Sequence, residues 1–306
     1  MAYVSFLFIC LVWGASFILM KKGAVWFSPA AIGAWRVIGG AAVLGLACWW
    51  TRVPWAIRRR DLRAVAVVVA CGFAWPFCVQ PFLVARDGSA FIAMTVSFTP
   101  LITIAASIPL LGIYPARRQL FGVLGALGFM ALLMWDGRMN RQIPIGDLGL
   151  ALTVPLCYAV TNTVIRRSLS HVPPLELSFI SLAAAGVILL PVALLVPFER
   201  GSADMADRNA AIGSLLFLGI VGTGLTTFLF NRLIQHHGPL FAGMVTNLVP
   251  IGALVWGWAD HERVTSLQLA ALGGLVSMVT VVQFGAARPA THNEMSQPQM
   301  DTDRHR

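Results

Sequence analysis

One arginine stands inside an otherwise apolar stretch and is the residue best suited to bind a ligand. Arg36 lies about seven residues into the run 29–50, roughly 10 Å from one end of a helix that rises about 1.5 Å per residue. Its guanidinium offers a planar fork of donors to a carboxylate or phosphate. Two interpretations stay open. Arg36 binds an anionic substrate group in a watery cavity, or it snorkels outward or caps carbonyls of a neighbouring helix.

Aromatic and small polar side chains interrupt the other apolar runs and are candidates for contacts with the same substrate. Tyr158 and Asn162 are four residues apart, so one helical face presents a hydroxyl and an amide. Asn247 precedes Pro250 by three residues, where proline frees a backbone carbonyl. Each of these side chains is equally suited to an interhelical bond of about 1 kcal/mol or less. The predicted substrate-binding residues are Trp13, Ser16, Arg36, Trp75, Gln80, Thr95, Tyr158, Asn162, Phe228, Thr246 and Asn247.

Prolines inside the apolar runs are candidate hinges. Pro100 and Pro250 are predicted gating positions, because a proline can bend a helix and such bends can accompany alternating access. In a rigid bundle the same residues are only tolerated kinks.

Groups needed for other chemistries lie away from the middle of the runs. Acidic residues occur only near the ends of the runs, so proton coupling through a buried carboxylate is unsupported, and facilitated diffusion or exchange fits equally well. No phosphate-binding loop is present. His236 with His237, and the stretch 260–262, lack a metal-ligand spacing, and the five cysteines lack CxxC pairs. We therefore expect no catalytic residue, metal or cofactor; a membrane-embedded enzyme is the alternative that these histidines would support.

The composition places these residues in a lipid environment. Hydrophobic residues make up 58% of the 306 positions and charged residues 11%, which is more apolar side chain than a soluble core can bury. Each apolar run approaches the roughly 20 residues that an α-helix needs to cross a bilayer. We predict an all-α membrane protein with ten transmembrane helices, at about 3–20, 29–50, 62–84, 89–111, 117–135, 145–166, 175–197, 210–231, 239–259 and 266–285.

The charges in the loops predict the orientation. Loops after even-numbered runs carry ten basic and two acidic residues (10 − 2 = +8), whereas loops after odd-numbered runs carry eight of each (8 − 8 = 0). Basic loops stay in the cytoplasm, so both termini are predicted to be cytoplasmic. The net charge of +9 is thus a topology signal, and no nucleic-acid partner is expected.

The two halves of the chain echo one another. Shifting the stretch 238–283 back by 150 positions places Phe241 over Phe91, Met244 over Met94 and Pro250 over Pro100. Five helices per copy is an odd number, so the second copy must enter the membrane from the opposite side as an inverted repeat. The predicted units are 1–137, with helices one to five; 138–285, with helices six to ten; and 286–306, a disordered cytoplasmic tail.

Motifs in both halves resemble the EamA family of the drug/metabolite transporter superfamily. The resemblance covers nearly the whole chain and rests on LVWGASFILMKKG, SPAAIGAWRVIGG, and GP…A…L.P followed by DHERVTSLQ. It implies a ten-helix inner-membrane carrier, usually an exporter of small metabolites or amino acids. One departure is that the acidic residue expected in the first half, matching Glu262, is replaced near Ile113. The two hairpins therefore do not carry a symmetrical pair of glutamates.

These observations predict a secondary transporter of the cell inner (plasma) membrane. It would move a small-molecule substrate, an amino acid or similar zwitterion or anion, by alternating access. A multidrug or cationic amine efflux carrier is the less favoured alternative, because no mid-membrane carboxylate awaits a cation. Glycines at 122, 125, 128, 273 and 274 would serve close helix packing within one protomer or between two, so a homodimer stays open.

Overall fold

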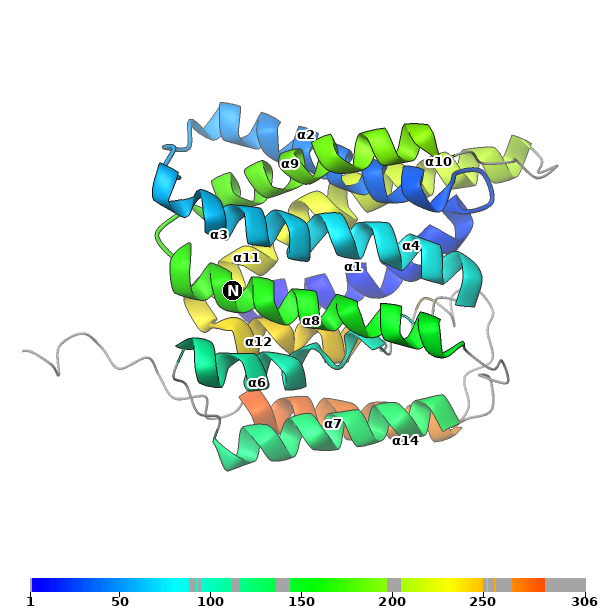
Figure 1. Ribbon diagram of the computed structural model, residues 1–306. Coiled ribbons are helices and arrows are strands. Elements are labelled where there is room, and N and C mark those ends of the chain that lie inside the picture. Colours follow the sequence, from blue (N-terminus) through cyan, green and yellow to red (C-terminus); the bar gives the residue numbers. More distant parts are fainter. Residues whose placement is uncertain are drawn as a thin grey trace, which may run out of the picture.

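The computed structural model is a bundle of helices that run roughly parallel or antiparallel to one another (Figure 1). Every regular element in the described part of the chain is helical. The described residues are 2–87, 92, 95–111, 116–135, 144–196, 205–249, 252, 256 and 266–283. The predicted tail 286–306 and Pro250 therefore lie outside them.

Six of the described helices are long and apolar enough to cross a membrane. They are α1 (Ala2–Gly23), α2 (Pro29–Thr51), Arg59–Asp87, α8 (Ile145–Ser168), α9 (Pro174–Leu195) and Arg208–His237. The other predicted runs contain α6 (Thr99–Leu111), α7 (Arg117–Trp135), α12 (Pro239–Gly243) and α14 (Ser266–Gln283). The all-helical membrane class is confirmed, while the count of ten stays a prediction.

Two of the long helices contain a wider π-helical turn near their middle. The first is built from η1 (Arg59–Asp61), α3 (Leu62–Val67), the π segment η2 (Val68–Ala74) and α4 (Trp75–Asp87). The second is built from α10 (Met205–Gly219), the π segment η3 (Ile220–Leu225) and α11 (Thr226–His237). Such turns inside α-helices are rare and frequently mark functional sites.

Glycines let α2 approach these helices at backbone distance. A Cβ added to Gly40 would lie 3.1 Å from the backbone nitrogen of Gly224 in η3, and one added to Gly39 would lie 3.2 Å from Cα of Gly219. Gly33 in turn packs against the backbone carbonyl of Phe77 on α4. Because glycine lacks a Cβ, the backbone of α2 can pack directly against both of the long helices that contain a π segment.

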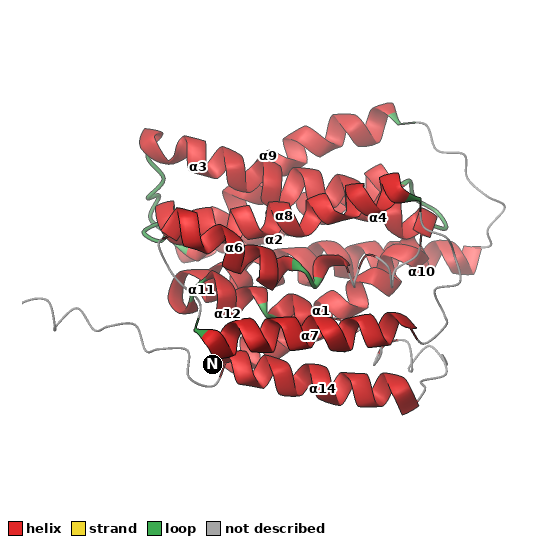
Figure 2. Ribbon diagram, turned by 60° about the horizontal axis from the view of Figure 1, so that its bottom comes forward, coloured by secondary structure: helices red, strands yellow, loops and turns green. Residues whose placement is uncertain are grey.

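Helices at corresponding places in the two predicted repeats pack together. The second helix, α2, lies along the seventh, α9, and the fifth, α7, lies along the tenth, α14 (Figures 1 and 2). Other contacts are reciprocal: α1 touches α10, η3 and α11, while α8 touches η2 and α4. The two halves of the chain are therefore intimately packed rather than separate domains.

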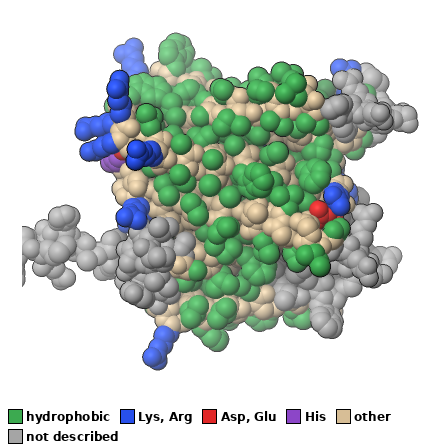
Figure 3. Space-filling model, in the orientation of Figure 1, with side chains coloured by type: hydrophobic (Ala, Val, Ile, Leu, Met, Phe, Trp, Pro, Cys, Tyr) green, Lys and Arg blue, Asp and Glu red, His purple; other side chains and the backbone are tan. Residues whose placement is uncertain are grey.

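The surface is apolar around the middle of the bundle. Figure 3 shows hydrophobic side chains over most of this face, with most of its Lys and Arg side chains at one end and a few at the other. The end with most of them holds the exposed Arg58, Arg59, Arg60 and Arg63. Exposed tryptophans Trp49, Trp50 and Trp55 are near them in sequence. An apolar belt bordered by tryptophan and arginine is the pattern of a protein embedded in a bilayer.

The loop at this end is fastened by a buried carboxylate. Glu176, at the start of α9, is 1% exposed. Its oxygens accept hydrogen bonds from the backbone N–H of Ala56 at 2.9 Å and of Ile57 at 3.0 Å. Asp61 accepts from the N–H of Arg58 at 2.9 Å and lies 3.2 Å from His171. The Glu176 bonds join the segment after α2 to the start of α9, and the Asp61–His171 contact joins η1 to the α8–α9 loop.

Candidate functional site

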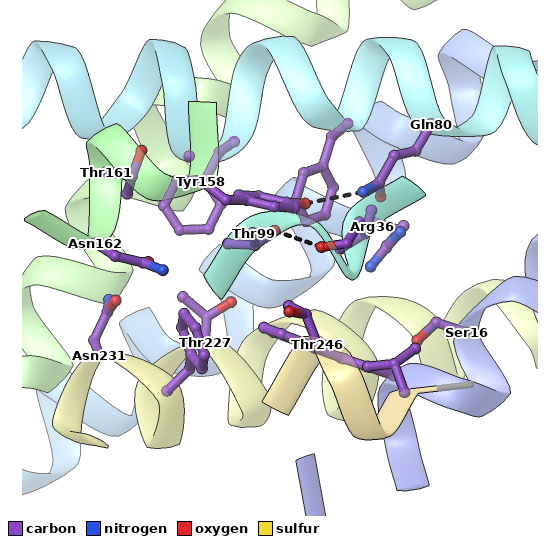
Figure 4. A pocket seen from close by; sticks show the side chains of 18 of the residues that line it. Ser16, Arg36, Gln80, Thr99, Tyr158, Thr161, Asn162, Thr227, Asn231 and Thr246 are labelled. Carbon is purple, nitrogen blue, oxygen red and sulfur yellow. Dashed lines mark hydrogen bonds between the residues drawn. The ribbon is translucent and has the colours of Figure 1, made fainter. Parts of the chain in front are cut away.

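A cavity opens where α1, α2, α4, α8 and α11 converge. All the space not filled by atoms in this region, including space open to solvent, amounts to about 820 Å³. Figure 4 shows Arg36 and Gln80 at one end, Asn162 and Asn231 at the other, and Tyr158, Thr227 and Thr246 between them. Seven of the predicted residues line it: Trp13, Ser16, Arg36, Gln80, Tyr158, Asn162 and Thr246.

Arg36 is buried inside this cavity and does not reach outward. The side chain is 5% exposed. Its Nε donates to Thr223 Oγ1 at 3.2 Å, its Nη1 lies 3.3 Å from Met20 Sδ, and its Cζ lies 4.4 Å from the centre of the Phe77 ring. A hydroxyl, a thioether and an aromatic face hold the guanidinium in place, but they do not neutralise its charge.

Among the described residues that line the cavity, no carboxylate serves as a counter-ion for Arg36. The lining contains one ionisable cation, Arg36, and neither aspartate nor glutamate within the described part of the chain. A charge held at membrane depth costs at least about 2.5 kcal/mol on insertion scales. A bound anion would offset that cost with charge-assisted hydrogen bonds.

Tyr158 and Gln80 form a second polar group beside Arg36. The amide Nε2 of Gln80 donates to the Tyr158 hydroxyl at 3.1 Å, and Figure 4 shows this bond on the side of the cavity where Arg36 lies. The Tyr158 hydroxyl keeps its own proton for another acceptor. An anion bound to Arg36 could therefore accept from Tyr158 as well.

Aromatic rings form much of the wall. Trp13 donates from Nε1 to Thr226 Oγ1 at 3.0 Å, and its ring centre lies 4.9 Å from that of Phe230. Phe73 and Phe77, from η2 and α4, line the cavity as well. A site with one charged end and aromatic walls fits a substrate with both an ionised group and an apolar body.

Four predicted residues are not among the residues that line the cavity. Trp75 is 44% exposed and donates to Thr153 Oγ1 at 2.7 Å, and Phe228 packs against the core. Thr95 is buried elsewhere, and Asn247, 1% exposed, has its Nδ2 3.8 Å from Met244 Sδ. These four residues were chosen by type, and residue type alone does not tell which face of a helix is turned toward the cavity.

The structure places one of the two predicted hinge prolines. Pro100 is the second residue of α6, which begins at Thr99 directly after Ser97 and Phe98, two residues in turn conformation. Proline at the start of a helix breaks none of its hydrogen bonds. Pro100 therefore lies in the first turn of α6, next to the break at Ser97 and Phe98, and not in the middle of a helix.

Several polar lining residues escaped the sequence analysis. They are Thr99, Thr161, Thr227 and Asn231. The helical period that paired Tyr158 with Asn162 also pairs Thr227 with Asn231, four residues apart. The same spacing rule would have found this second pair on α11.

The alternative of a metal enzyme gains nothing from the described residues. No group of three or more His, Cys, Asp or Glu side chains that could hold a metal is found among them. His236 and His237 are exposed at the end of α11, and the stretch 260–262 lies outside the part that the structure describes.

Comparison with solved structures shows the same fold elsewhere. One crystal structure superposes with a TM-score of 0.77, covering 92% of this chain and 96% of the other. The sequences are 14% identical, so the likeness is one of fold.

Comparison with known sequences identifies the family. The chain is 22% identical over 263 residues to the uncharacterized transporter YoaV of Bacillus subtilis strain 168, covering 84% of this chain and 88% of the relative. It is 24% identical over 305 residues to the uncharacterized transporter YyaM of the same organism, covering 96% and 97%. The sequence profile of the EamA-like transporter family matches residues 1–135 and again 145–283. The chain thus belongs to the EamA-like transporter family, a membrane transporter family of the drug/metabolite transporter type.

Proposed function

We propose that this protein is a secondary carrier for a small organic anion or zwitterion, such as an amino acid, whose carboxylate binds Arg36. The observation that carries the proposal is the buried guanidinium in the cavity without a carboxylate beside it among the described residues. Arginine matches the geometry of a carboxylate with paired N–H donors. Thr223 and Phe77 hold the side chain and leave donors for the ligand.

Transport by alternating access fits the arrangement of the helices. The reciprocal packing of corresponding helices supports an inverted repeat, in which one half rocks against the other around a central site. The break before Pro100 and the glycine contacts of α2 are where such rocking would bend or slide the chain. Pro250 is the matching hinge in the second half by sequence.

The proposed location is the inner membrane, with both termini in the cytoplasm. The loop-charge balance of +8 against 0 supports this orientation. With that orientation Arg36 lies nearer the outer face and Asn162 nearer the cytoplasm. Export is the proposed direction, on the resemblance to exporters in the family.

Proteoliposome uptake tests the proposal directly. The purified full chain would be offered a mixture of amino acids, organic acids, nucleosides and cationic amines, and the imported compounds would be read by mass spectrometry. We expect amino or organic acids to enter, and Arg36→Ala to reduce their uptake at least about tenfold, because it removes charge-assisted hydrogen bonds.

A matched variant separates binding from folding. Arg232→Ala removes an exposed arginine of α11, and its uptake should equal that of the wild type. Uptake of cationic amines that survives Arg36→Ala would contradict the anion site and favour cationic efflux. Equal loss of uptake in both variants would also count against a specific role for Arg36.

A further inference from the structure

The cavity has a second polar end, opposite Arg36. Asn162 on α8 and Asn231 on α11 are each 2% exposed and both line the cavity. Figure 4 shows their amides facing each other at the end away from Arg36 and Gln80. Thr227, one turn before Asn231, lines the wall between the two ends.

The orientation of the Asn231 amide follows from its partner. The Ser178 hydroxyl donates its only proton to the carbonyl of Pro174, at 2.6 Å. It can therefore only accept from Asn231, whose Nδ2 lies 2.8 Å away. The amide nitrogen is held towards α9, which leaves the carbonyl oxygen Oδ1 of Asn231 as an acceptor at the cavity.

Asn162 supplies the complementary donor. Its Nδ2 is buried and has no hydrogen-bond partner among the described residues. The neighbouring Thr161 Oγ1 is in the same condition. Buried amide groups are almost always paired, and leaving one unpaired is costly. The unpaired Asn162 donor and the Asn231 carbonyl oxygen line the same end of the cavity, and together they suit a ligand group that can both accept and donate.

The group that fits this end is uncharged. No Asp, Glu, Lys or Arg other than Arg36 is found among the cavity residues that the structure describes, so a charged group would be buried there without a counter-ion. A hydroxyl or a carboxamide offers both an acceptor and a donor and carries no charge.

The spacing of the two ends sets the size of the ligand. Tyr158, whose partner Gln80 lies beside Arg36, precedes Asn162 by four residues on α8, or about 6 Å at 1.5 Å per residue. An aromatic ring or a short alkyl chain bridges this distance, between walls formed by Trp13, Phe73 and Phe230.

We propose that Asn162 and Asn231 form a specificity subsite for an uncharged hydroxyl or carboxamide at the end of the substrate remote from its anionic group. The inference rests on the anion site proposed at Arg36. The preferred substrates are then acids with an apolar body and a neutral polar tip, and substrates with a second charge at that tip are disfavoured.

Binding of matched probes tests the subsite. Phenylacetate, para-hydroxyphenylacetate and para-(aminomethyl)phenylacetate share a carboxylate and a ring and differ at the tip. Isothermal titration of the full chain in nanodiscs should show para-hydroxyphenylacetate binding about tenfold tighter than phenylacetate, the effect of one well-formed buried hydrogen bond. The aminomethyl probe should bind more weakly than phenylacetate.

Two variants locate the effect at Asn162. In Asn162→Ala the ratio of the affinities for para-hydroxyphenylacetate and phenylacetate should fall to about one. Phenylacetate itself should still bind, which reports that the site is folded. In Asn162→Asp the preference should move to the aminomethyl probe, because the new carboxylate pairs with its ammonium. Thr163→Ala is the matched control. Thr163 is buried next to Asn162 but bonds the carbonyl of Ala159 in its own helix, and its loss should keep the tenfold preference.

The outcomes distinguish the two proposals. Phenylacetate binding that needs Arg36 but gains nothing from the hydroxyl would overturn the subsite and leave the anion site standing. A hydroxyl advantage that persists in Asn162→Ala would also overturn it. Failure of folded wild-type protein to bind any of the probes would overturn both.

Discussion

The two π-helical segments have the same backbone form but present different chemistry. η3 places the Thr223 hydroxyl on Arg36, and Thr226, the residue after it, accepts from Trp13 at the cavity wall. η2 lines the cavity with Gly72 and Phe73, and the residue after it is Trp75. Trp75 turns to the surface, where it bonds Thr153.

The difference shows how two similar halves can line one cavity with unlike side chains. Both segments are followed by a residue in a tryptophan–threonine hydrogen bond to a helix of the other half. Only the bond beside η3 borders the cavity. We infer that η3 sets the polarity of the site and that η2 supplies its apolar wall, and the following experiments test that division.

The largest effect is expected where α2 crosses η3. Gly40→Val adds atoms at a point where a Cβ alone would lie 2.9 Å from Leu182 Cδ1 and 3.1 Å from the Gly224 backbone nitrogen. Because backbone cannot yield as a side chain can, we expect a loss of about 3 kcal/mol or more in stability. Thermal unfolding in detergent would measure it.

The matching change beside η2 should be milder. A Cβ on Gly72 would meet the side chain of Thr161 at 2.9 Å, so Gly72→Ala should cost roughly 1–2 kcal/mol. Gly128→Ala is the control, since a Cβ there meets nothing within 4 Å. Equal losses of stability for Gly40→Val and Gly128→Ala would show that the close contact between α2 and η3 is not the cause of the destabilisation.

The next effect concerns the hydroxyl that η3 gives to Arg36. Thr223→Val keeps the side-chain shape and removes the acceptor 3.2 Å from Arg36 Nε. Losing a hydrogen bond to a charged group is worth about 1.5–3 kcal/mol, so substrate affinity should fall about tenfold or more. Equilibrium binding measures the change, and unchanged affinity would mean that the substrate does not depend on how Arg36 is held.

The two tryptophan–threonine bonds should respond differently. Thr226→Val removes the acceptor of Trp13 and should weaken binding about fivefold, because Trp13 lines the cavity. Thr153→Val removes the acceptor of the exposed Trp75 and should leave binding unchanged. Parallel titrations of the two variants give the comparison, and equal effects would contradict the division of roles between η3 and η2.

The smallest effect is expected on the side of η2. Phe77→Leu removes the ring that lies 4.4 Å from Arg36 Cζ, an interaction worth about 0.5–1 kcal/mol. Since Thr223 and Met20 still hold the guanidinium, affinity should fall roughly two- to fivefold. A loss larger than that of Thr223→Val would reverse the assignment of roles to the two segments.

Hydropathy predicted the six long apolar helices that the structure describes, because lipid leaves the backbone few alternatives to a helix. The eighth helix, predicted to end at 231, continues to His237. Its polar end is used inside the protein, since Gln235 donates to the carbonyls of Leu169 at 3.0 Å and Val172 at 2.9 Å. The π segments were not predictable, because VVACGFA and IVGTGL read as ordinary apolar helix.

The residues that line the cavity were predictable where polar side chains recur at helical spacing, and they were unpredictable elsewhere. Arg36, Tyr158 and Asn162 stand out because few side chains of their kind occur at membrane depth. Trp75 and Phe228 were chosen by type, but an aromatic residue in an apolar helix faces lipid as readily as a cavity. The packing of neighbouring helices determines which way these two side chains point, and the sequence of one helix does not reveal that packing.

The joint between α11 and α12 is a single residue. α11 ends at His237 and α12 begins at Pro239, so only Gly238, with φ +89°, separates them. Glycine is needed there because other residues are strained at positive φ. So short a joint has no slack. We therefore expect that a displacement of α12 during transport would also move α11, which carries Thr227 and Asn231.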